Sequence, residues 1–140
     1  MYKRQRITQI ETIRLLVEAG VTVICAGGGG IPVARDANGT LHGLEAVIDK
    51  DRAACLLAKA LGADAFLMLT DVDAVYDAWG TVDKRPIRKV TPAELNSDVF
   101  AAGSMRPKVE AACDFANAGG IAGIGRLEDC LLYTSPSPRD

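Results

Sequence analysis

The stretch VTVICAGGGG, residues 21–30, decides the fold class of this chain. Its first part is apolar and rich in β-branched side chains, which is typical of a buried parallel strand. Four consecutive glycines follow and would end that strand. We therefore expect a strand over residues 21–26, with the glycines at its carboxyl end.

Helices and strands alternate on both sides of this stretch. Apolar residues recur at helical spacing in the segment before Gly20, and two further segments expected to be helical also end at a glycine that would stop a helix. Such an alternation indicates an α/β fold with an open, mostly parallel sheet. The expected helices cover residues 8–19, 49–61 and 103–118, and the further strands cover residues 65–69 and 121–124.

Two shorter elements have local signals of their own. The turn Ala37-Asn38-Gly39 separates two short extended stretches within residues 31–48, which predicts a hairpin. Thr91 precedes Pro92, and Glu94 stands at the third helical position. This capping pattern predicts the start of a short helix.

The composition favours a single globular domain. The chain has 140 residues, 49% of them hydrophobic, and a net charge of −2 with scattered Lys and Arg, which argues against nucleic acid as a partner. No apolar stretch approaches the ~20 residues of a membrane span, and no signal peptide begins the chain, so we expect no membrane contact and a cytoplasmic location. The widely spaced Cys25, Cys55, Cys113 and Cys130, with His42 as the one histidine, indicate reduced thiols and no metal site.

The two ends differ from the rest of the chain. Residues 131–140, LLYTSPSPRD, have no hydrophobic period and two Ser-Pro pairs, which predicts disorder. They and residues 1–5 resemble translated adapter sequence, so we expect both ends to be non-native and the chain to be a fragment. Functional reasoning is therefore confined to residues 6–129.

The glycine run matches no common nucleotide-binding motif. Pro32 and Val33 stand where a G-x-G-x-x-G pattern would need glycine, and no Gly-Lys-Ser/Thr follows. A turn needs only one or two glycines. Backbone amides lining a pocket for a small anion are the preferred interpretation, with turn geometry alone as the alternative.

Two lysines stand at the expected starts of helices. Lys50 lies between Asp49 and Asp51, which suit a helix cap, and Lys108 follows Pro107. A helix N-terminus favours anions, so a lysine there indicates a phosphate that faces it. Phosphoryl transfer is the chemistry that uses such pairs of cations.

Asp71 and Asp73 follow the strand expected at residues 65–69. The run FLMLTDVDAVY resembles the first motif of haloacid-dehalogenase-type phosphatases, in which the first aspartate is the nucleophile and the second a general acid. Ala74 replaces the glycine usual in that family, and no convincing downstream lysine and aspartates follow. A polar loop that ends a strand is the alternative.

Several motifs together resemble the C-terminal half of the carbamate kinase family, within the amino-acid kinase superfamily. They are GGGGIPV, EAVIDKD, LTDVDAVY, TPAEL and GSMRPKVEAA, in this order, and the resemblance covers nearly all of residues 6–129. It implies a three-layer αβα sandwich with a mostly parallel open sheet, here an incomplete amino-acid kinase fold. These residues would form the nucleotide-binding half of the domain.

The resemblance also implies an activity and its residues. The reaction is reversible phosphoryl transfer between carbamoyl phosphate and ADP, giving ATP and carbamate, with Mg²⁺ bound to the nucleotide. Lys50 and Lys108 would stabilise the transferring group, and Asp51 would hold the lysines in place. The implied substrate-binding residues are Gly27, Gly28, Gly29 and Gly30, and the implied nucleotide-binding residues are Thr70, Asp71, Val72, Asp73, Tyr76, Ser104 and Met105.

The family also uses an N-terminal half that this chain lacks. We therefore expect the chain alone to have no appreciable kinase activity, and its parent to be a homodimeric enzyme. Two alternatives remain at this point: a dehalogenase-type phosphatase that uses Asp71 and Asp73, and a nucleotide-binding module without catalysis.

Overall fold

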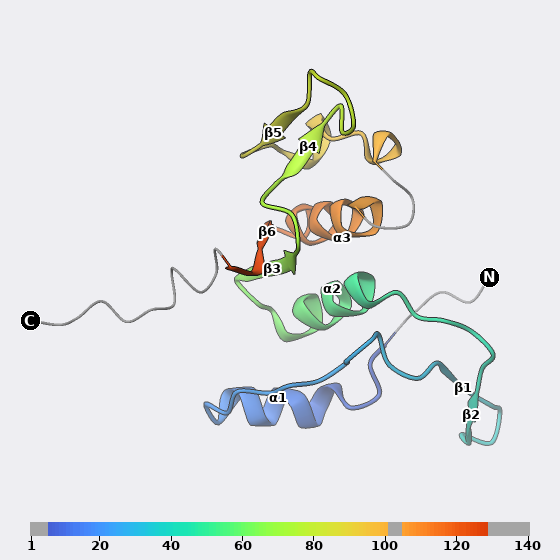
Figure 1. Ribbon diagram of the computed structural model, residues 1–140. Helices are drawn as coiled ribbons and strands as arrows, with labels where there is room; N and C mark the ends of the chain where they lie inside the picture. The colour runs from blue at the N-terminus through green and yellow to red at the C-terminus, as the bar shows by residue number, and fades with distance from the viewer. Residues whose placement is uncertain (1–5, 101–104, 129–140) are drawn as a thin grey trace, which may run out of the picture. The chain divides into compact units, whose positions relative to one another are not determined.

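The computed structural model describes residues 6–100 and 105–128. The chain divides into two compact units, Met1–Ala63 (unit 1) and Asp64–Asp140 (unit 2), and each is described by itself (Figure 1). Together they contain the helices and strands of an α/β protein. Among the described residues no helix is long and apolar enough to cross a membrane.

Unit 1 contains two helices, α1 (Ile10–Glu18) and α2 (Lys50–Leu61), both close to the predicted bounds. Ile10 and Ile13 are the buried residues of α1, and Ala53 and Cys55 those of α2. The helices contact each other, and a hydrogen bond of 2.5 Å from the Arg14 guanidinium to the Ala60 carbonyl joins them. This contact forms the small core of unit 1.

The predicted hairpin is present in unit 1. Strands β1 (Val33–Arg35) and β2 (Leu41–Gly43) are antiparallel, with Ala34 opposite His42. Asp36 holds the turn, because its carboxylate accepts the backbone N–H groups of Asn38 and Thr40, each at 2.9 Å. The Asn-Gly signal therefore predicted this element correctly.

The strand predicted over residues 21–26 is absent, and this prediction is wrong. The segment forms no strand with any residue that the structure describes, and Ile24 is 99% exposed. Composition favours a strand here, but a strand exists only where a neighbour completes its ladder of hydrogen bonds. The four glycines therefore follow an unpaired segment of chain.

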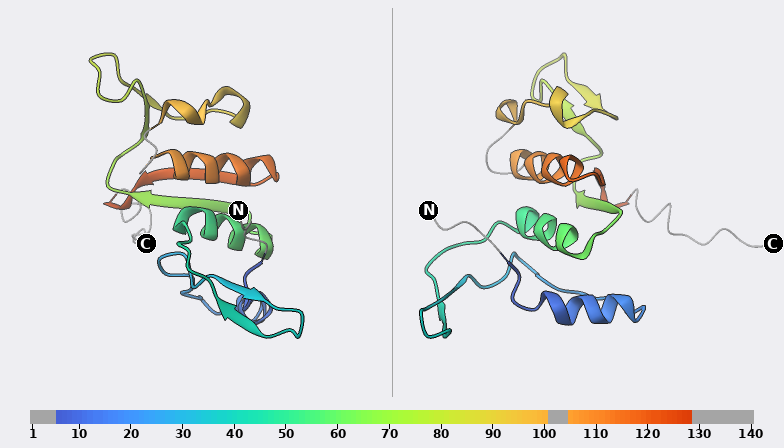
Figure 2. Two further views of the ribbon diagram at one scale, coloured as in Figure 1. Left: turned by 90° about the vertical axis from the view of Figure 1, so that its right-hand side faces the viewer. Right: turned by 180° about the vertical axis from the view of Figure 1, so that it is seen from behind.

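Unit 2 is built on a parallel pair of strands, β3 (Ala65–Thr70) and β6 (Ile121–Arg126). Their register runs from Ala65 opposite Ile121 to Thr70 opposite Arg126, so both carboxyl ends meet at one edge. Figure 2 shows the two strands side by side, with helix α3 (Met105–Asn117) along them. The predicted strands at residues 65–69 and 121–124, and the helix that precedes the second, are confirmed.

The core of unit 2 lies between this pair of strands and α3. Phe66 and Met68 alternate with exposed Leu67 and Leu69 along β3, as expected for a strand with one covered face. The rings of Phe66 and Phe115 lie 5.5 Å apart, and the other buried residues of α3 are Val109 and Ala111. Burial of these apolar side chains is the main stabilising term.

Short elements connect β3 to α3. A second hairpin, β4 (Val75–Asp77) with β5 (Arg85–Ile87), was not predicted. The short helix predicted at Thr91 is a 3-10 turn, η1 (Pro92–Glu94), with the expected capping box, and η2 (Ser97–Val99) follows it. Thr91 donates its backbone N–H to the Glu94 carboxylate at 2.8 Å, which fixes the start of η1.

Candidate functional site

The predicted site residues fall on both units. Unit 1 holds the glycines together with Lys50 and Asp51, while unit 2 holds the segment from Thr70 to Tyr76 together with Met105 and Lys108. Ser104 lies outside the described residues. The site is therefore described as two half-sites, one on each unit.

The glycine run of unit 1 forms a tight, irregular loop. Gly27, Gly29 and Gly30 have φ values of 47°, 128° and 91°, in the left-handed half of the backbone map that favours glycine. Ala26 shares this conformation at 65°. The positive φ values of the loop are therefore enough by themselves to favour glycine at several of its positions.

Gly29 also brings the loop close to the start of α2. A Cβ atom on residue 29 would collide with the carbonyl oxygen of Ile48 and lie 3.1 Å from its carbonyl carbon. Ile48 is followed by Asp49 and then Lys50, the first residue of α2. The structure thus brings the predicted substrate loop and a predicted catalytic lysine into one short stretch of unit 1.

The start of α2 has the predicted arrangement. Asp49 is the N-cap, and its carboxylate accepts the backbone N–H of Arg52 at 2.9 Å. Lys50 is exposed, and Asp51 is the acidic residue of the first turn. The Asp49 carboxylate is thus used as the cap, and Lys50 carries its positive charge on the first residue of the helix, at the positive end of the helix dipole.

The half-site of unit 2 lies at the carboxyl ends of β3 and β6. A cavity of about 470 Å³ opens there, and Thr70, Asp71 and Arg126 are among its lining residues. The Thr70 hydroxyl donates to the Asp71 carboxylate at 3.0 Å. Ligands of parallel α/β sheets bind at this kind of edge, so the position matches the prediction for Thr70 and Asp71.

Asp73 and Tyr76 form a hydrogen-bonded pair beside this edge. The Tyr76 hydroxyl lies 3.1 Å from each carboxylate oxygen of Asp73 and donates to them, while the nearer oxygen of Asp73 lies 3.9 Å from a guanidinium nitrogen of Arg126. The hydrogen bond to Asp73, with lesser contributions from burial and the Asp73 charge, raises the pKa of Tyr76. Arg126 and Arg88 oppose that rise. Asp73 therefore fixes the orientation of the Tyr76 hydroxyl, which acts as a hydrogen-bond donor.

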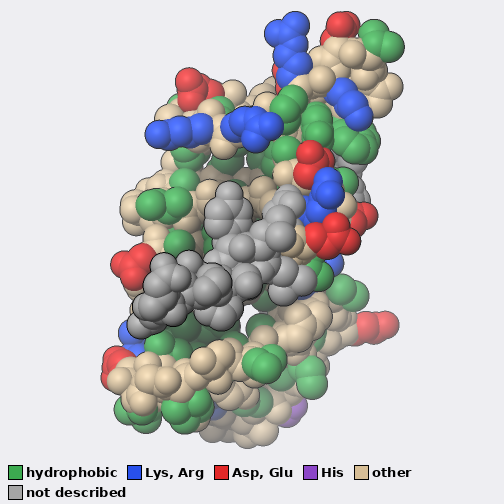
Figure 3. Space-filling model, turned by 60° about the vertical axis from the view of Figure 1, so that its left-hand side comes forward, with side chains coloured by type: hydrophobic (Ala, Val, Ile, Leu, Met, Phe, Trp, Pro, Cys, Tyr) green, Lys and Arg blue, Asp and Glu red, His purple; other side chains and the backbone are tan. Residues whose placement is uncertain are grey.

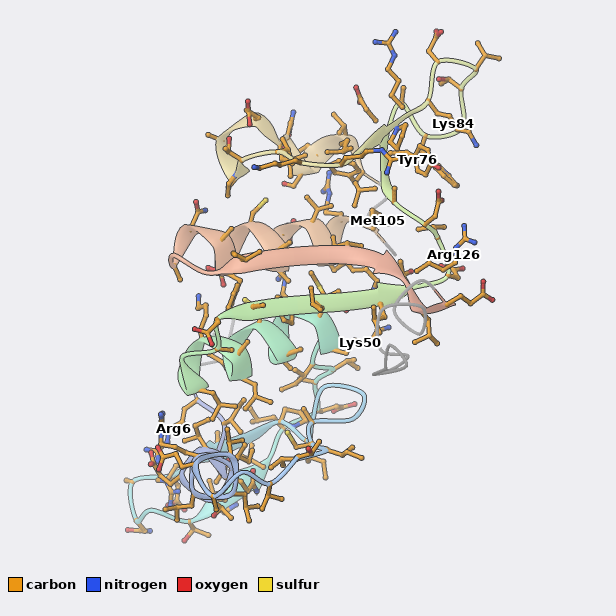
Figure 4. The ribbon with its side chains drawn as sticks, turned by 90° about the vertical axis from the view of Figure 1, so that its left-hand side faces the viewer. Arg6, Lys50, Tyr76, Lys84, Met105 and Arg126 are labelled. Atoms are coloured by element: carbon orange, nitrogen blue, oxygen red, sulfur yellow. The ribbon has the colours of Figure 1, made fainter. Side chains whose placement is uncertain are left out.

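The first turn of α3 lies toward the same edge. Since α3 leads into β6 through a short turn and packs along it, the N-terminal end of α3 lies near the carboxyl end of that strand. Figure 4 shows Met105 toward the end of this unit where Arg126 lies. The predicted residues Met105 and Lys108 thus share this edge with the segment from Thr70 to Tyr76.

Arg126 and Glu128 line the cavity but were not predicted. The Arg126 guanidinium lies 3.8 Å from the Glu128 carboxylate, and its Nε atom is buried without a hydrogen-bond partner among the described residues. Arg126 directly follows the predicted strand and Gly125, so a charged residue at a strand's carboxyl end was the signal that could have found it.

Cysteine chemistry adds nothing to either half-site. Cys25, Cys55 and Cys113 are thiols rather than disulfide partners, as predicted, and Cys130 lies outside the described residues. Burial raises the pKa of the Cys113 thiol. A thiol of this kind stays protonated and serves as a small apolar side chain.

Comparison with known proteins identifies the family. The sequence profile described as "Amino acid kinase family" matches residues 2–124. The chain belongs to the amino acid kinase family. This assignment agrees with the α/β architecture and replaces the dehalogenase-type phosphatase as an explanation of Asp71 and Asp73.

Within the amino acid kinase family, the chain is similar to carbamate kinases. It is 49% identical over 128 residues to "Carbamate kinase" of Rhizobium meliloti (strain 1021), covering 89% of this chain and 40% of that protein. It is 51% identical over 122 residues to the protein of that name from Halobacterium salinarum, covering 84% and 39%. The chain thus spans about 40% of the length of these relatives.

Solved structures give the same family and fold. "Carbamate kinase from Giardia lamblia bound to AMP-PNP" superimposes with a TM-score of 0.84 and 40% sequence identity, covering 92% of this chain and 48% of that one. The structure titled "Structure of Giardia Carbamate Kinase" gives a TM-score of 0.81 and 38% identity, covering 91% of this chain and 47% of that one. The predicted amino-acid kinase fold, present here as a fragment, is therefore confirmed.

Proposed function

We propose that this chain is the nucleotide-binding part of a carbamate kinase, and that it supplies Lys50, Asp51 and Lys108 to reversible phosphoryl transfer. The observation that carries this proposal is the place of the two lysines. Lys50 is the first residue of α2, and Lys108 lies in the first turn of α3. Both lysines therefore belong to the start of a helix, where backbone N–H groups favour a phosphate.

The reaction needs positioning and charge rather than a protein nucleophile. A β-phosphate oxygen of ADP attacks the phosphorus of carbamoyl phosphate, the bond from phosphorus to the carbamate oxygen breaks, and carbamate leaves. Negative charge on the transferring group is spread over its outer oxygens. The ammonium groups of Lys50 and Lys108 would stabilise this charge, and Asp51 would orient the lysines through charge-assisted hydrogen bonds.

The glycine loop would bind the carbamoyl end of the substrate. The amides of Gly27 and Gly29 already donate within the loop, to the carbonyls of Cys25 and Ala26, each at 2.9 Å. Among the described residues no backbone carbonyl accepts from Gly28 or Gly30. Those two N–H groups are the ones that this proposal assigns to the small anionic end of carbamate.

Magnesium would arrive with the nucleotide. Within residues 6–100 and 105–128, no group of three or more His, Cys, Asp or Glu side chains is placed to hold a metal ion. These side chains thus fit a Mg²⁺ ion that is bound by the phosphate oxygens of the nucleotide better than a metal ion bound permanently by the protein. The chain's contribution is to hold the phosphates, and Thr70, Asp71, Val72, Asp73, Tyr76, Ser104 and Met105 would lie along the nucleotide.

A chimera tests this proposal. The N-terminal portion of the Rhizobium meliloti relative, joined to this chain in place of its own matching region, should form ATP from ADP and carbamoyl phosphate. Lys108→Ala in the chimera should lower kcat/KM by ~100-fold or more, because it removes transition-state stabilisation. Lys89→Ala, at an exposed lysine after β5, is the matched control and should change little.

Two results would overturn the proposal. One is full activity of the Lys108→Ala chimera, which would remove that lysine from the reaction. The other is phosphatase activity of the chain that Asp71→Asn abolishes, which would restore the dehalogenase-type alternative. The 140-residue chain alone should form no ATP at a measurable rate.

A further inference from the structure

Arg106 lies in the first turn of α3, where a helix disfavours a cation, and its guanidinium makes defined contacts with η2. Its Nε atom donates to the Ser97 carbonyl at 3.1 Å, and a terminal nitrogen donates to the Asp98 carbonyl at 2.8 Å. The same terminal nitrogen lies 3.0 Å from the Asp98 carboxylate, which compensates the charge. We call these three contacts the η2 brace.

The η2 brace fastens the start of α3 to a part of unit 2 that is itself held. Phe100, directly after η2, is buried at 8% exposure, and its backbone N–H donates to the Ser97 carbonyl at 3.2 Å. The Ser97 carbonyl therefore accepts from both Phe100 and Arg106. The brace thus ties the helix to an anchored turn rather than to a free stretch of chain.

The brace lies close to Lys108, the lysine that the proposed function places in the reaction. The first N–H groups of a helix have no intrahelical partner, and helix ends open at a low cost in free energy. Val109 is 1% exposed, so packing fixes the helix directly after Lys108. Arg106 fixes the turn directly before it. The backbone of Lys108 is therefore held from both sides.

Arg106 is better suited to hold the helix than to bind a phosphate itself. Its Nε atom and a terminal nitrogen already donate to protein oxygens, and its side chain is 30% exposed. In the upper part of Figure 3, where unit 2 lies, Lys and Arg side chains stand among acidic and hydrophobic ones. Such mixed charge creates no strong attraction for an anion. The contacts within the chain therefore account for this arginine.

We infer that Arg106 is a positioning residue for Lys108 in the proposed phosphoryl transfer, on which this inference rests. A displacement of about 1 Å in a catalytic group can cost on the order of 100-fold in rate. The planar guanidinium suits this role, because its fork reaches oxygens in two directions, whereas a lysine ammonium is a single point charge. Loss of the brace should therefore weaken transition-state stabilisation more than substrate binding.

Kinetics of the chimera with the Rhizobium meliloti N-terminal portion test the inference. Arg106→Gln should lower kcat about tenfold and change the KM values of ADP and carbamoyl phosphate less than about twofold. Arg106→Lys should be equally impaired, because an ammonium cannot reproduce the fork. Asp98→Asn should lose little, since both backbone carbonyls still accept. Arg85→Gln, at an exposed arginine of β5, is the matched control and should change neither constant.

A double-mutant cycle separates positioning from a direct role in the reaction. Because Arg106 acts through Lys108, Arg106→Gln should have little further effect on kcat once Lys108→Ala is present. Effects of the two substitutions that multiply would show that Arg106 acts independently, and would overturn the inference. Recovery of kcat in Arg106→Lys would also overturn it, since charge alone would then suffice.

Hydrogen exchange of the intact 140-residue chain gives a readout without catalysis. Backbone amides at the start of α3 should exchange severalfold faster in Arg106→Gln, because the helix end opens more often. Amides of β3 should not change, and neither should the emission of Trp79, which is 62% exposed between β4 and β5. Unchanged exchange in α3, or a change throughout unit 2, would overturn the local role given to Arg106.

The outcomes distinguish this inference from the proposed function. An active chimera that is insensitive to Arg106→Gln overturns the inference and leaves the kinase proposal intact. A folded chimera that forms no ATP refutes the kinase proposal, and the inference falls with it because Lys108 then has no reaction to serve. A lower kcat in Arg106→Gln, together with faster exchange at the start of α3, supports both.

Discussion

The backbone of Gly29 lies against the carbonyl group of Ile48, with no room for a side chain between them. This contact joins the glycine loop to the residues that lead into α2, so at least one of the four glycines is required by packing. Its neighbour Gly28 has open space around it and an ordinary φ. Packing therefore requires glycine at position 29 but not at position 28.

Gly29→Ala should destabilise the chain, whereas Gly28→Ala should not. A side chain at position 29 meets the Ile48 carbonyl and must adopt a φ of 128°, so a loss on the order of 2 kcal/mol is expected. Urea unfolding followed by circular dichroism measures both variants. Equal stability of the two would show that the loop moves away from Ile48 without cost.

Phe115→Ala should be among the most damaging single changes in unit 2. The side chain is 3% exposed and contacts the Phe66 ring, so its removal leaves a cavity and should cost about 3–5 kcal/mol. Val99→Ala, at a residue that is 64% exposed, is the control and should cost far less. Comparable unfolding midpoints for the two variants would contradict the core described for unit 2.

Tyr76 should ionise above the ordinary pKa of tyrosine, because its hydroxyl donates to Asp73. A pKa raised by folding means that the associated stability is complete below pH 10 and is lost as the pH rises through the folded pKa. Absorbance of tyrosinate at 295 nm follows this titration. Asp73→Ala should lower the pKa of Tyr76, and an unchanged titration would show that the hydrogen bond is absent in solution.

Asp36 should remain ionised to lower pH than an ordinary aspartate. The hydrogen bond to His42, at 2.8 Å, is the main cause of its lowered pKa, with the Thr40 N–H next. The stability linked to this group is present above the ordinary pKa and is lost as the pH falls through the folded pKa. Carbon-13 NMR of the carboxyl group should show the pKa of Asp36 rising in His42→Ala.

Much of the fold could be predicted because its signals are local. Helix α2 begins at the Asp49 cap and ends at Gly62, which has a φ of 68° and can adopt this conformation without a Cβ penalty. The alternation along β3, with Phe66 inside and Leu67 outside, likewise follows from its sequence. Each of these features depends on residues close together in the chain.

The errors occurred where the outcome depends on distant residues. Residues 21–26 have the composition of a strand, but the described chain offers them no neighbour to pair with. Hairpin β4–β5 was not predicted, because Pro86 weakens the strand signal of β5. In the structure β5 is nevertheless a strand, and Pro86 pairs with Tyr76 of β4. Strand pairing is a property of two segments, and neither sequence alone specifies it.

The sequence motifs indicated candidate site residues, but they did not indicate the contacts that these residues make. The motifs indicated Asp73 and Tyr76, yet the hydrogen bond between them and the ion pair of Asp73 with Arg126 depend on the turn after β3. Arg126 was missed because a single arginine after a glycine-rich strand carries no motif. Trp79 and Lys84 belong to no recognised pattern, and only the hairpin brings their side chains together.

The place of Trp79 has a practical consequence for spectroscopy of this chain. The buried aromatic residues of unit 2, Phe66, Phe100 and Phe115, are all phenylalanines, whereas the tryptophan is on an exposed loop. Intrinsic emission should therefore change little when the hydrophobic core melts and should respond mainly to events on one hairpin. In this chain, the optical signal that usually monitors global denaturation is instead a local sensor.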